Sequence, residues 1–181
     1  TITVTPVNRP PLLADDRFTV AEDSTTPLPV LANDTDPDGD PLTLVSVLTT
    51  NGSATLSGTN VLYTPAADFF GTNTLSYCAT DGLVTNCATL TVEVLPVNDA
   101  PLAFSQSVTN LEDTPVLITL SGADEDGPVT NFTLVSLPAH GVLTGAGANW
   151  TYTPNADFFG SDSFTFTVND GALTSTVATV S

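Results

Sequence analysis

Two stretches of this 181-residue chain carry the same motifs in the same order. Residues 98–181 follow residues 8–92 at an offset of 88 to 90 positions, so that Asp-Phe-Phe-Gly begins at Asp68 and again at Asp157. A fixed period indicates one structural unit in series. A period of about 90 residues is too long for one turn of a solenoid and suits a small independent domain. The sequence therefore predicts two similar domains in tandem.

The two ends of the chain fit the same period. Thr-Ile-Thr-Val-Thr-Pro-Val at 1–7 aligns with Thr-Val-Glu-Val-Leu-Pro-Val at 91–97, and Ser181 is expected to correspond to Val92. We expect a terminal strand stub of a preceding repeat at 1–7, the first repeat at 8–97 and the second at 98–181. This organisation is typical of a segment of a longer polypeptide.

Acidic residues dominate the charge of the chain. It has 20 Asp and Glu against two cationic side chains, Arg9 and Arg17, and its net charge is -18. Nucleic acids and anionic lipids bind cationic patches, so neither is an expected partner. No membrane-spanning run is visible, and we expect no direct membrane insertion. The apolar fraction of 41% is ordinary, so each repeat can bury its own core.

Short segments of alternating polar and apolar residues fill each repeat. In Leu-Ser-Tyr-Cys-Ala at 75–79 every second residue is apolar, as in a strand with one buried face. In the first repeat we expect strands at residues 18–20, 28–31, 42–48, 53–56, 61–64, 75–79 and 88–94. The predicted fold class is all-β: two tandem seven-stranded immunoglobulin-like β-sandwiches, joined by a short linker that contains Pro96 and Pro101.

The two cysteines of the chain, Cys78 and Cys87, flank an Asp-Gly turn. If that turn closes a hairpin, the two side chains face each other across it, as Thr167 and Thr176 would in the second repeat. A cross-strand disulfide is expected, and it suits an oxidising compartment. The alternative is that both cysteines are free thiols. A metal site is not expected, because two cysteines alone supply too few ligands.

Carboxylates gather at the ends of the expected strands in both repeats. A sandwich brings its loops to two poles, and the poles of consecutive domains meet at the linker. Crowded carboxylates repel one another unless a cation neutralises them. Calcium takes about six to eight hard oxygen ligands in flexible geometry. The pattern therefore indicates Ca²⁺ as the cofactor.

The motifs also resemble a known family. Val-Asn-Asp-Ala-Pro at 97–101 is similar to the linker of cadherin repeats, and Thr-Asp-Pro-Asp at 35–38 to their Asp-x-Asp motif. Together with Leu-Ala-Asn-Asp, Tyr-Thr-Pro and Asp-Phe-Phe-Gly, they most closely resemble the bacterial cadherin-like tandem repeats of large secreted or surface adhesins. The resemblance covers the whole chain.

The resemblance implies calcium ligands at two places. A junction site would use Glu22, Asp68, Asn98, Asp99, the carbonyl of Ala100, Asp124, Asp126 and Asp170. A weaker terminal site would use Asn8, Asp36, Asp38 and Asp81. The chain departs from cadherins at Pro96, Ala100 and Phe70, so one or two junction ions are expected rather than three. Arg9 replaces the counterpart of Asp99, which exchanges a ligand for a positive charge.

Several of these residues have alternative, structural roles. Asp81 and Asp170, each followed by Gly, can form ordinary hairpin turns. Asp68 can cap the turn before the aromatic pair, and residues 34–40 can form a solvated acidic loop. Trp150 could stack on a sugar, but it shares strand parity with Tyr152, which favours packing in the core. The Phe-Phe pairs are expected to anchor the core.

The function that these features favour is structural: a calcium-stiffened extender of an extracellular adhesin, secreted or at the cell surface. Its partners would be Ca²⁺ and the neighbouring repeats of the same chain. The alternative is a module that binds surface polysaccharide or another copy of itself. An enzyme is not expected, because the chain has one His, no Lys and no nucleophile, phosphate-loop or zinc motif.

Overall fold

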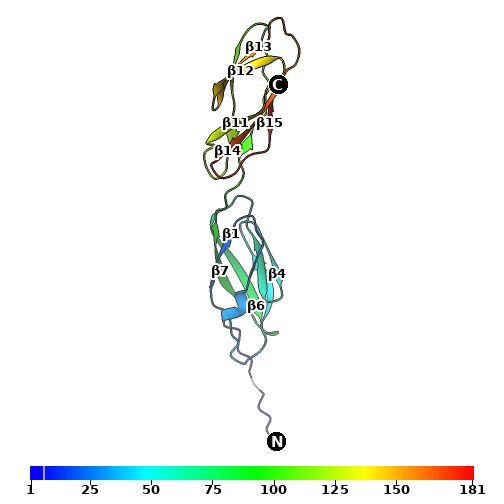
Figure 1. Ribbon diagram of the computed structural model, residues 1–181. Coiled ribbons are helices and arrows are strands. Elements are labelled where there is room, and N and C mark those ends of the chain that lie inside the picture. The colour runs from blue at the N-terminus through cyan, green and yellow to red at the C-terminus, as the bar shows by residue number, and fades with distance from the viewer. Residues whose placement is uncertain (6) are drawn as a thin grey trace. The chain divides into compact units, whose positions relative to one another are not determined.

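The computed structural model describes residues 1–5 and 7–181. It divides into two compact units, Thr1–Val97 and Asn98–Ser181 (Figure 1). The segment expected as a strand stub, residues 1–7, includes Pro6, which lies outside the described residues. Its other members belong to the first unit and are not in a strand.

The first unit is an immunoglobulin-like β-sandwich of two sheets, with strand orders β1-β7-β6-β3 and β2-β5-β4. Its strands are β1 (Asp16–Ala21), β2 (Thr26–Leu28), β3 (Thr43–Leu48), β4 (Ser53–Ser57), β5 (Asn60–Thr64), β6 (Gly71–Thr80) and β7 (Thr85–Leu95). The predicted alternation is clearest in β6, where Leu75 and Tyr77 are buried while the neighbouring Thr74 and Ser76 are exposed. Burial of alternate residues on both sheets builds the core between them.

One strand of the first unit is shorter than expected. Residues 28–31 were predicted to form a strand, but β2 ends at Leu28 and the chain turns into a short 3-10 helix, η1 (Val30–Asn33). Pro29 explains the break, because proline donates no hydrogen bond to a strand ladder. Val30 still reaches the core and is fully buried.

The second unit repeats the sandwich with shorter sheets, ordered β11-β14-β15, β12-β13-β9 and β10-β8. Its strands are β8 (Leu102–Ala103), β9 (Val116–Thr119), β10 (Gly122–Ala123), β11 (Asn131–Ser136), β12 (Gly141–Ala146), β13 (Asn149–Pro154), β14 (Phe164–Asn169) and β15 (Ala178–Val180). Phe164, Phe166 and Val168 of β14 form the centre of its core. Both units are all-β, as the sequence predicts.

The disulfide between Cys78 and Cys87 is present, with the two residues paired across β6 and β7. The expected matching pair of the second unit, Thr167 and Thr176, does not form. The β14–β15 ladder ends at Phe166 and Ala178, and buried Ser175 accepts the Val168 amide with its Oγ instead. Within the described residues, no helix has the length and apolarity needed to cross a bilayer.

Candidate metal-binding poles

The topology of the first unit brings several acidic residues to one pole, here called the exit pole: Glu22, Asp23 and Asp68, together with residues 96–97. Strands β1 and β7 are parallel, so Ala21 pairs with Leu95 and both strands end together. Strand β6 runs antiparallel to β7 and begins at the same level, where Gly71 pairs with Val94. Residues that follow β1, follow β7 or precede β6 therefore meet at this pole.

Glu22 is the most unusual residue of the exit pole. It is only 2% exposed, and its Oε1 accepts a hydrogen bond from the Val97 amide at 2.7 Å. Its Oε2 is buried and accepts no hydrogen bond. Burying a carboxylate when only one of its two oxygens accepts a hydrogen bond costs folding free energy, unless a cation lies nearby.

Asp23 and Asp68 form a second feature of the exit pole. Both adopt a positive φ of 56°, a left-handed conformation that Asp tolerates better than most residues. The Asp68 amide donates to Asp23 Oδ1 at 3.4 Å, so Asp23 caps the turn for which Asp68 was the alternative cap. The second unit repeats this corner with Asp113 and Asp157 at 3.0 Å. Asp23 was not among the predicted ligands, although Glu-Asp recurs in both repeats.

The second unit begins with a pole of its own, the entry pole, in which the linker residues bind to two acidic loops. Asn98 Nδ2 donates to Asp170 Oδ2 at 2.7 Å, and the Asp99 amide donates to Asp126 Oδ2 at 2.7 Å. Asp170 also closes its own turn, since its Oδ1 accepts the amides of Ala172 and Leu173. The Asn98 side chain and these amides lower the pKa of Asp170. Asp170 is thus a turn residue and a partner of the linker at once.

Asp124 completes the entry pole. Its Oδ1 accepts the amide of Asp126 at 2.9 Å, while its Oδ2 is buried and accepts no hydrogen bond. Ala100, whose carbonyl was a predicted ligand, is exposed. Of the predicted junction residues, Glu22 and Asp68 belong to the first unit and the other six belong to the second.

The first unit carries the same entry pole, as the repeat predicts. Asn8 Nδ2 donates to Asp81 Oδ2 at 2.8 Å, and the Arg9 amide donates to Asp38 Oδ2 at 2.6 Å. Asp38 in turn donates its amide to Asp36 Oδ1 at 2.7 Å, and Asp36 Oδ2 is buried without a partner. Carboxylate oxygens of Asp36, Asp38 and Asp40 all lie within 4.8 Å of one another.

The two entry poles differ in charge because the first contains Arg9. Its guanidinium binds Asp38 Oδ1 through Nε at 2.9 Å and Nη2 at 2.7 Å, and also donates to the Pro37 carbonyl. The hydrogen bond from Arg9 lowers the pKa of Asp38. The guanidinium thus supplies at this pole the positive charge that the second entry pole lacks.

The unpaired oxygens test whether these poles suit a cation. In the described part of the chain, four carboxylate oxygens are buried without a hydrogen bond, and they belong to Asp16, Glu22, Asp36 and Asp124. Three of these four residues are predicted calcium ligands. Hard carboxylate oxygens with free lone pairs are what calcium binds, so the donor set fits this ion.

The remaining predicted residues have structural roles. Asp34 at the start of the acidic loop accepts the Ala14 amide and the Tyr77 hydroxyl, at 2.8 and 2.9 Å. Trp150 packs against the core of the second unit, and its Nε1 donates to the Gly147 carbonyl at 2.8 Å. The second Phe of each pair does not anchor the core as expected: Phe70 is 57% and Phe159 84% exposed.

Each unit has a polar network that the sequence did not reveal; its central residue is buried in the first unit and half-buried in the second. In the first unit Asn73 donates to the Tyr63 hydroxyl at 2.9 Å. In the second unit Asp162 takes the place of Asn73 and accepts the Tyr152 hydroxyl at 2.9 Å, along with the amides of Ala139 and His140. Burial alone would raise the pKa of Asp162, but these hydrogen bonds outweigh it and the pKa falls below the ordinary 3.8.

This network predicts an acid sensitivity confined to the second unit. A lowered pKa means that the ionised Asp162 stabilises the fold; its contribution is complete above the ordinary value of 3.8 and is lost as the pH falls through the lowered value. In Asp162→Asn this part of the acid dependence should vanish. At neutral pH the variant should lose about 1–3 kcal/mol, because an amide group cannot accept all of these hydrogen bonds.

Trp150 is the single Trp of the chain, so its fluorescence reports acid and denaturant unfolding of the second unit alone. The first unit, which has Asn73 in this place, is the internal control: its transition is the part of the far-UV circular dichroism signal that Trp150 fluorescence does not follow. An identical acid transition in wild type and Asp162→Asn would contradict the assignment.

Comparison with known proteins agrees with this architecture. The bacterial Ig domain family matches residues 8–94 and again residues 98–181. No curated protein sequence matches the chain. Among solved structures, human protocadherin-24 EC1-2 aligns with a TM-score of 0.53 at 15% sequence identity, covering 97% of this chain and 98% of that chain.

Two further solved structures align with the chain to different extents. A second crystal form of human protocadherin-24 EC1-2 has a TM-score of 0.53 at 14% identity, covering 96% of this chain and 98% of that one. An endo-fucoidan hydrolase from glycoside hydrolase family 107 has a TM-score of 0.44 at 21% identity; 94% of this chain is covered, but only 28% of the hydrolase. The likeness to protocadherin, at this level of identity, is one of fold.

The family match extends over nearly the whole chain, in two tandem copies. The sheets of each unit and the cadherin fold of the aligned structures agree with it. This chain belongs to the bacterial Ig domain family, as a tandem pair of cadherin-like immunoglobulin domains.

Proposed function

We propose that the chain is a calcium-binding structural extender of an extracellular or cell-surface adhesin, stiffened by Ca²⁺ at the junction of its two domains. It acts as a spacer rather than as a catalyst. The observation that carries the proposal is Glu22, a buried carboxylate that touches the linker with one oxygen and leaves the other unpaired. Structural packing alone gives no reason to bury such a charge.

The linker supports a shared site. Glu22 of the first unit binds the Val97 amide, and Asp126 of the second binds the Asp99 amide, each at 2.7 Å. Two residues of extended chain span at most about 7 Å, so the two carboxylates are held close to the same short stretch of backbone. Asp68, Asn98, Asp124 and Asp170 are the further oxygen donors that we assign to this site.

The mechanism follows from charge. Without calcium, the acidic residues of the exit and entry poles repel one another, and the linker acts as a hinge. Calcium accepts oxygens from both domains and from the linker, which removes the repulsion and fixes one orientation. Because extracellular modules bind calcium at roughly 0.1–1 mM, ambient calcium outside a cell would keep the segment rigid.

Isothermal titration of the full chain tests the proposal. We expect binding heat with a dissociation constant of roughly 0.1–1 mM for Ca²⁺, and weaker binding of Mg²⁺, which demands stricter octahedral geometry. A titration without heat at millimolar Ca²⁺ would end the proposal.

Arg9→Asp should create an additional calcium site at the first entry pole. The substitution removes the guanidinium from Asp38 and reproduces the Asn-Asp sequence found at 98–99. The titration of the variant should show at least one more ion bound per chain than the wild type.

Arg17→Asp is the matched control for this experiment. It makes the same change of charge, but Arg17 pairs with Glu93 on the face of a strand, away from the entry pole. Its stoichiometry should equal that of the wild type. If Arg9→Asp also bound the same number of calcium ions per chain as the wild type, the substitution would not have created a calcium site at the first entry pole.

A further inference from the structure

Strand β4 is an open edge of the first unit. It ends the sheet ordered β2-β5-β4, and among the described residues no strand pairs with its other side (Figure 1). Four of its five residues are exposed, and Leu56 is 37% exposed although it lies opposite the fully buried Val61. Alternate residues of an edge strand direct unpaired N–H and C=O groups outward, and these groups can pair with another strand.

The other three edge strands of the first unit are each protected against such pairing. Strand β1 carries the charged residues Asp16 and Arg17. Strand β2 has three residues and contains Pro27. Strand β3 is interrupted by a β-bulge between Leu44 and Ser46. Charges, prolines, short strands and bulges are the devices by which proteins prevent edge-to-edge association, and the regular ladder of β4 has none of them.

Strand β4 also lies in a part of the chain that has no charge. The acidic residues and both arginines fall outside residues 24–33 and 41–67, and these two stretches contain all of β2, β4 and β5. The net charge of -18 makes two copies of the chain repel each other. An approach through this sheet keeps the carboxylates of the two copies apart. The distribution of charge therefore favours the same surface as the open edge does.

We propose that β4 of one copy pairs antiparallel with β4 of a second copy, across a two-fold axis at Thr55, and so joins two three-stranded sheets into one. In this register Ala54 of each copy lies opposite Leu56 of the other. Both residues are on the core side of the sheet, where they pair with Tyr63 and Val61 of β5, so the contact covers the exposed part of Leu56. Main-chain hydrogen bonds supply the affinity, and the two-fold symmetry closes the assembly as a dimer.

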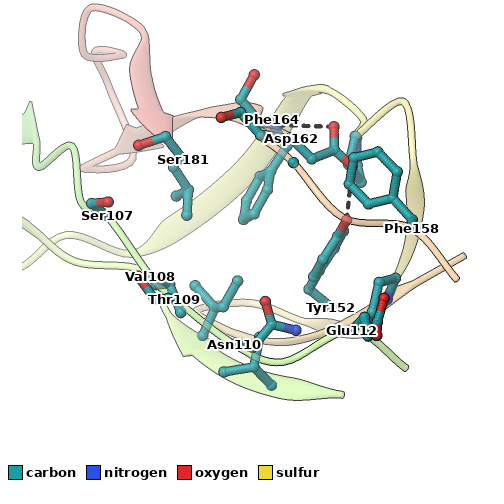
Figure 2. Close-up of a pocket in the computed structure, with 18 of the residues that line it drawn as sticks. Ser107, Val108, Thr109, Asn110, Glu112, Tyr152, Phe158, Asp162, Phe164 and Ser181 are labelled. Carbon is teal, nitrogen blue, oxygen red and sulfur yellow. Dashed lines mark hydrogen bonds between the residues drawn. The ribbon is translucent and has the colours of Figure 1, made fainter. Parts of the chain in front are cut away.

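The sheet is better suited to a protein strand than to a glycan. Sugar rings stack on exposed aromatic side chains, but the one aromatic residue in β2, β4 and β5 is Tyr63, which is fully buried. Its counterpart in the second unit, Tyr152, points toward Asp162, to which its hydroxyl donates at 2.9 Å (Figure 2). The outer face of β4 carries Ser53, Thr55 and Ser57 instead, which are short polar residues.

The counterpart of β4 in the second unit is a less regular edge. Strand β12 contains Gly141 and Gly145, and Gly145 adopts a φ of 151°. Glycine in the interior of a strand weakens it and leaves no side chain to pack against a partner. We therefore assign the contact to the first unit.

Sedimentation equilibrium of the full chain in the presence of a chelator tests this proposal separately from calcium binding. A pairing of five residues is a small interface, so the wild type should change from monomer to dimer as its concentration rises to roughly 1 mM. Higher salt should strengthen the dimer, because it screens the repulsion between two acidic copies.

Thr55→Lys and Thr55→Glu should each remain monomeric over the same range, because each places two like charges opposite one another at the axis. An equimolar mixture of the two variants should associate, because the facing charges are then opposite. Thr55 is exposed, so both variants should keep the melting temperature of the wild type.

Thr74→Lys is the matched control for the change of charge. Thr74 is exposed on β6, an inner strand of the other sheet, so this variant should dimerise like the wild type. The proposal is overturned by a wild type that stays monomeric at every concentration and salt, by a Thr55→Lys variant that dimerises equally, or by a mixture that does not associate. A monomeric wild type that binds the neutral glucan dextran, with binding lost in Thr55→Lys, would assign the surface to a glycan and also overturn it.

Discussion

Glu22→Gln should weaken calcium binding by roughly tenfold or more, because it removes a charged ligand from the centre of the proposed site. The same substitution should leave the calcium-free protein as stable as the wild type, or more stable. Gln can still accept the Val97 amide bond that Glu22 Oε1 accepts at 2.7 Å, while the cost of the buried charge disappears. The substitution should therefore destabilise the protein in calcium and leave it equally stable or more stable in chelator.

Thermal unfolding in calcium and in chelator measures this reversal, and calorimetric titration measures the affinity. Glu112→Gln is the matched control, since Glu112 is the counterpart of Glu22 but is exposed. It should change neither quantity. If Glu22→Gln destabilised the calcium-free protein and left the calcium affinity unchanged, Glu22 would be a structural residue and no ligand.

Removing the disulfide should produce the largest change in stability. The bond joins Cys78 to Cys87 across β6 and β7, with a sequence separation of 9. Closing a loop of this size restricts the unfolded chain and contributes about 2–3 kcal/mol on the chain-entropy estimate. For a domain of this size, the melting temperature of the first unit in Cys78→Ser, Cys87→Ser should fall by about 10 °C or more.

The second unit is the internal control for that experiment, because it contains no cysteine. Trp150 fluorescence should show its transition unchanged, while calorimetry shows the earlier transition of the first unit. Equal transitions for the double variant and the wild type would mean that the bond constrains a hairpin that is already formed in the unfolded chain.

Much of the fold could be predicted from local sequence patterns. The period of the repeat predicted two all-β units, and the alternation at 75–79 predicted strand β6. The Asp-Gly turns and the Asn of the linker predicted where the entry poles would lie, and the bonds from Asn8 to Asp81 and from Asn98 to Asp170 repeat the same contact in both units. These features depend on residues close in sequence or on motifs that recur.

Features set by distant contacts could not be predicted in this way. The parallel pairing of β1 with β7 joins residues more than 70 positions apart, and it is this pairing that buries Glu22, a residue type usually found at the surface. The left-handed backbone at Asp23 and the Asp162 network likewise depend on tertiary partners. Pro29 is a signal that the strand ends after Leu28, but the apolar residues that follow it, among them the buried Val30, made a longer strand the expected structure.

Small-angle X-ray scattering of the full chain, at low protein concentration, tests the central claim that calcium shared across the linker fixes the two domains. In excess calcium the scattering should fit one fixed arrangement of the domains. In chelator it should require an ensemble, with a changed distance distribution and maximum dimension, and Glu22→Gln in limiting calcium should resemble the chelated state. Identical scattering curves for the wild type with calcium and with chelator would contradict the account.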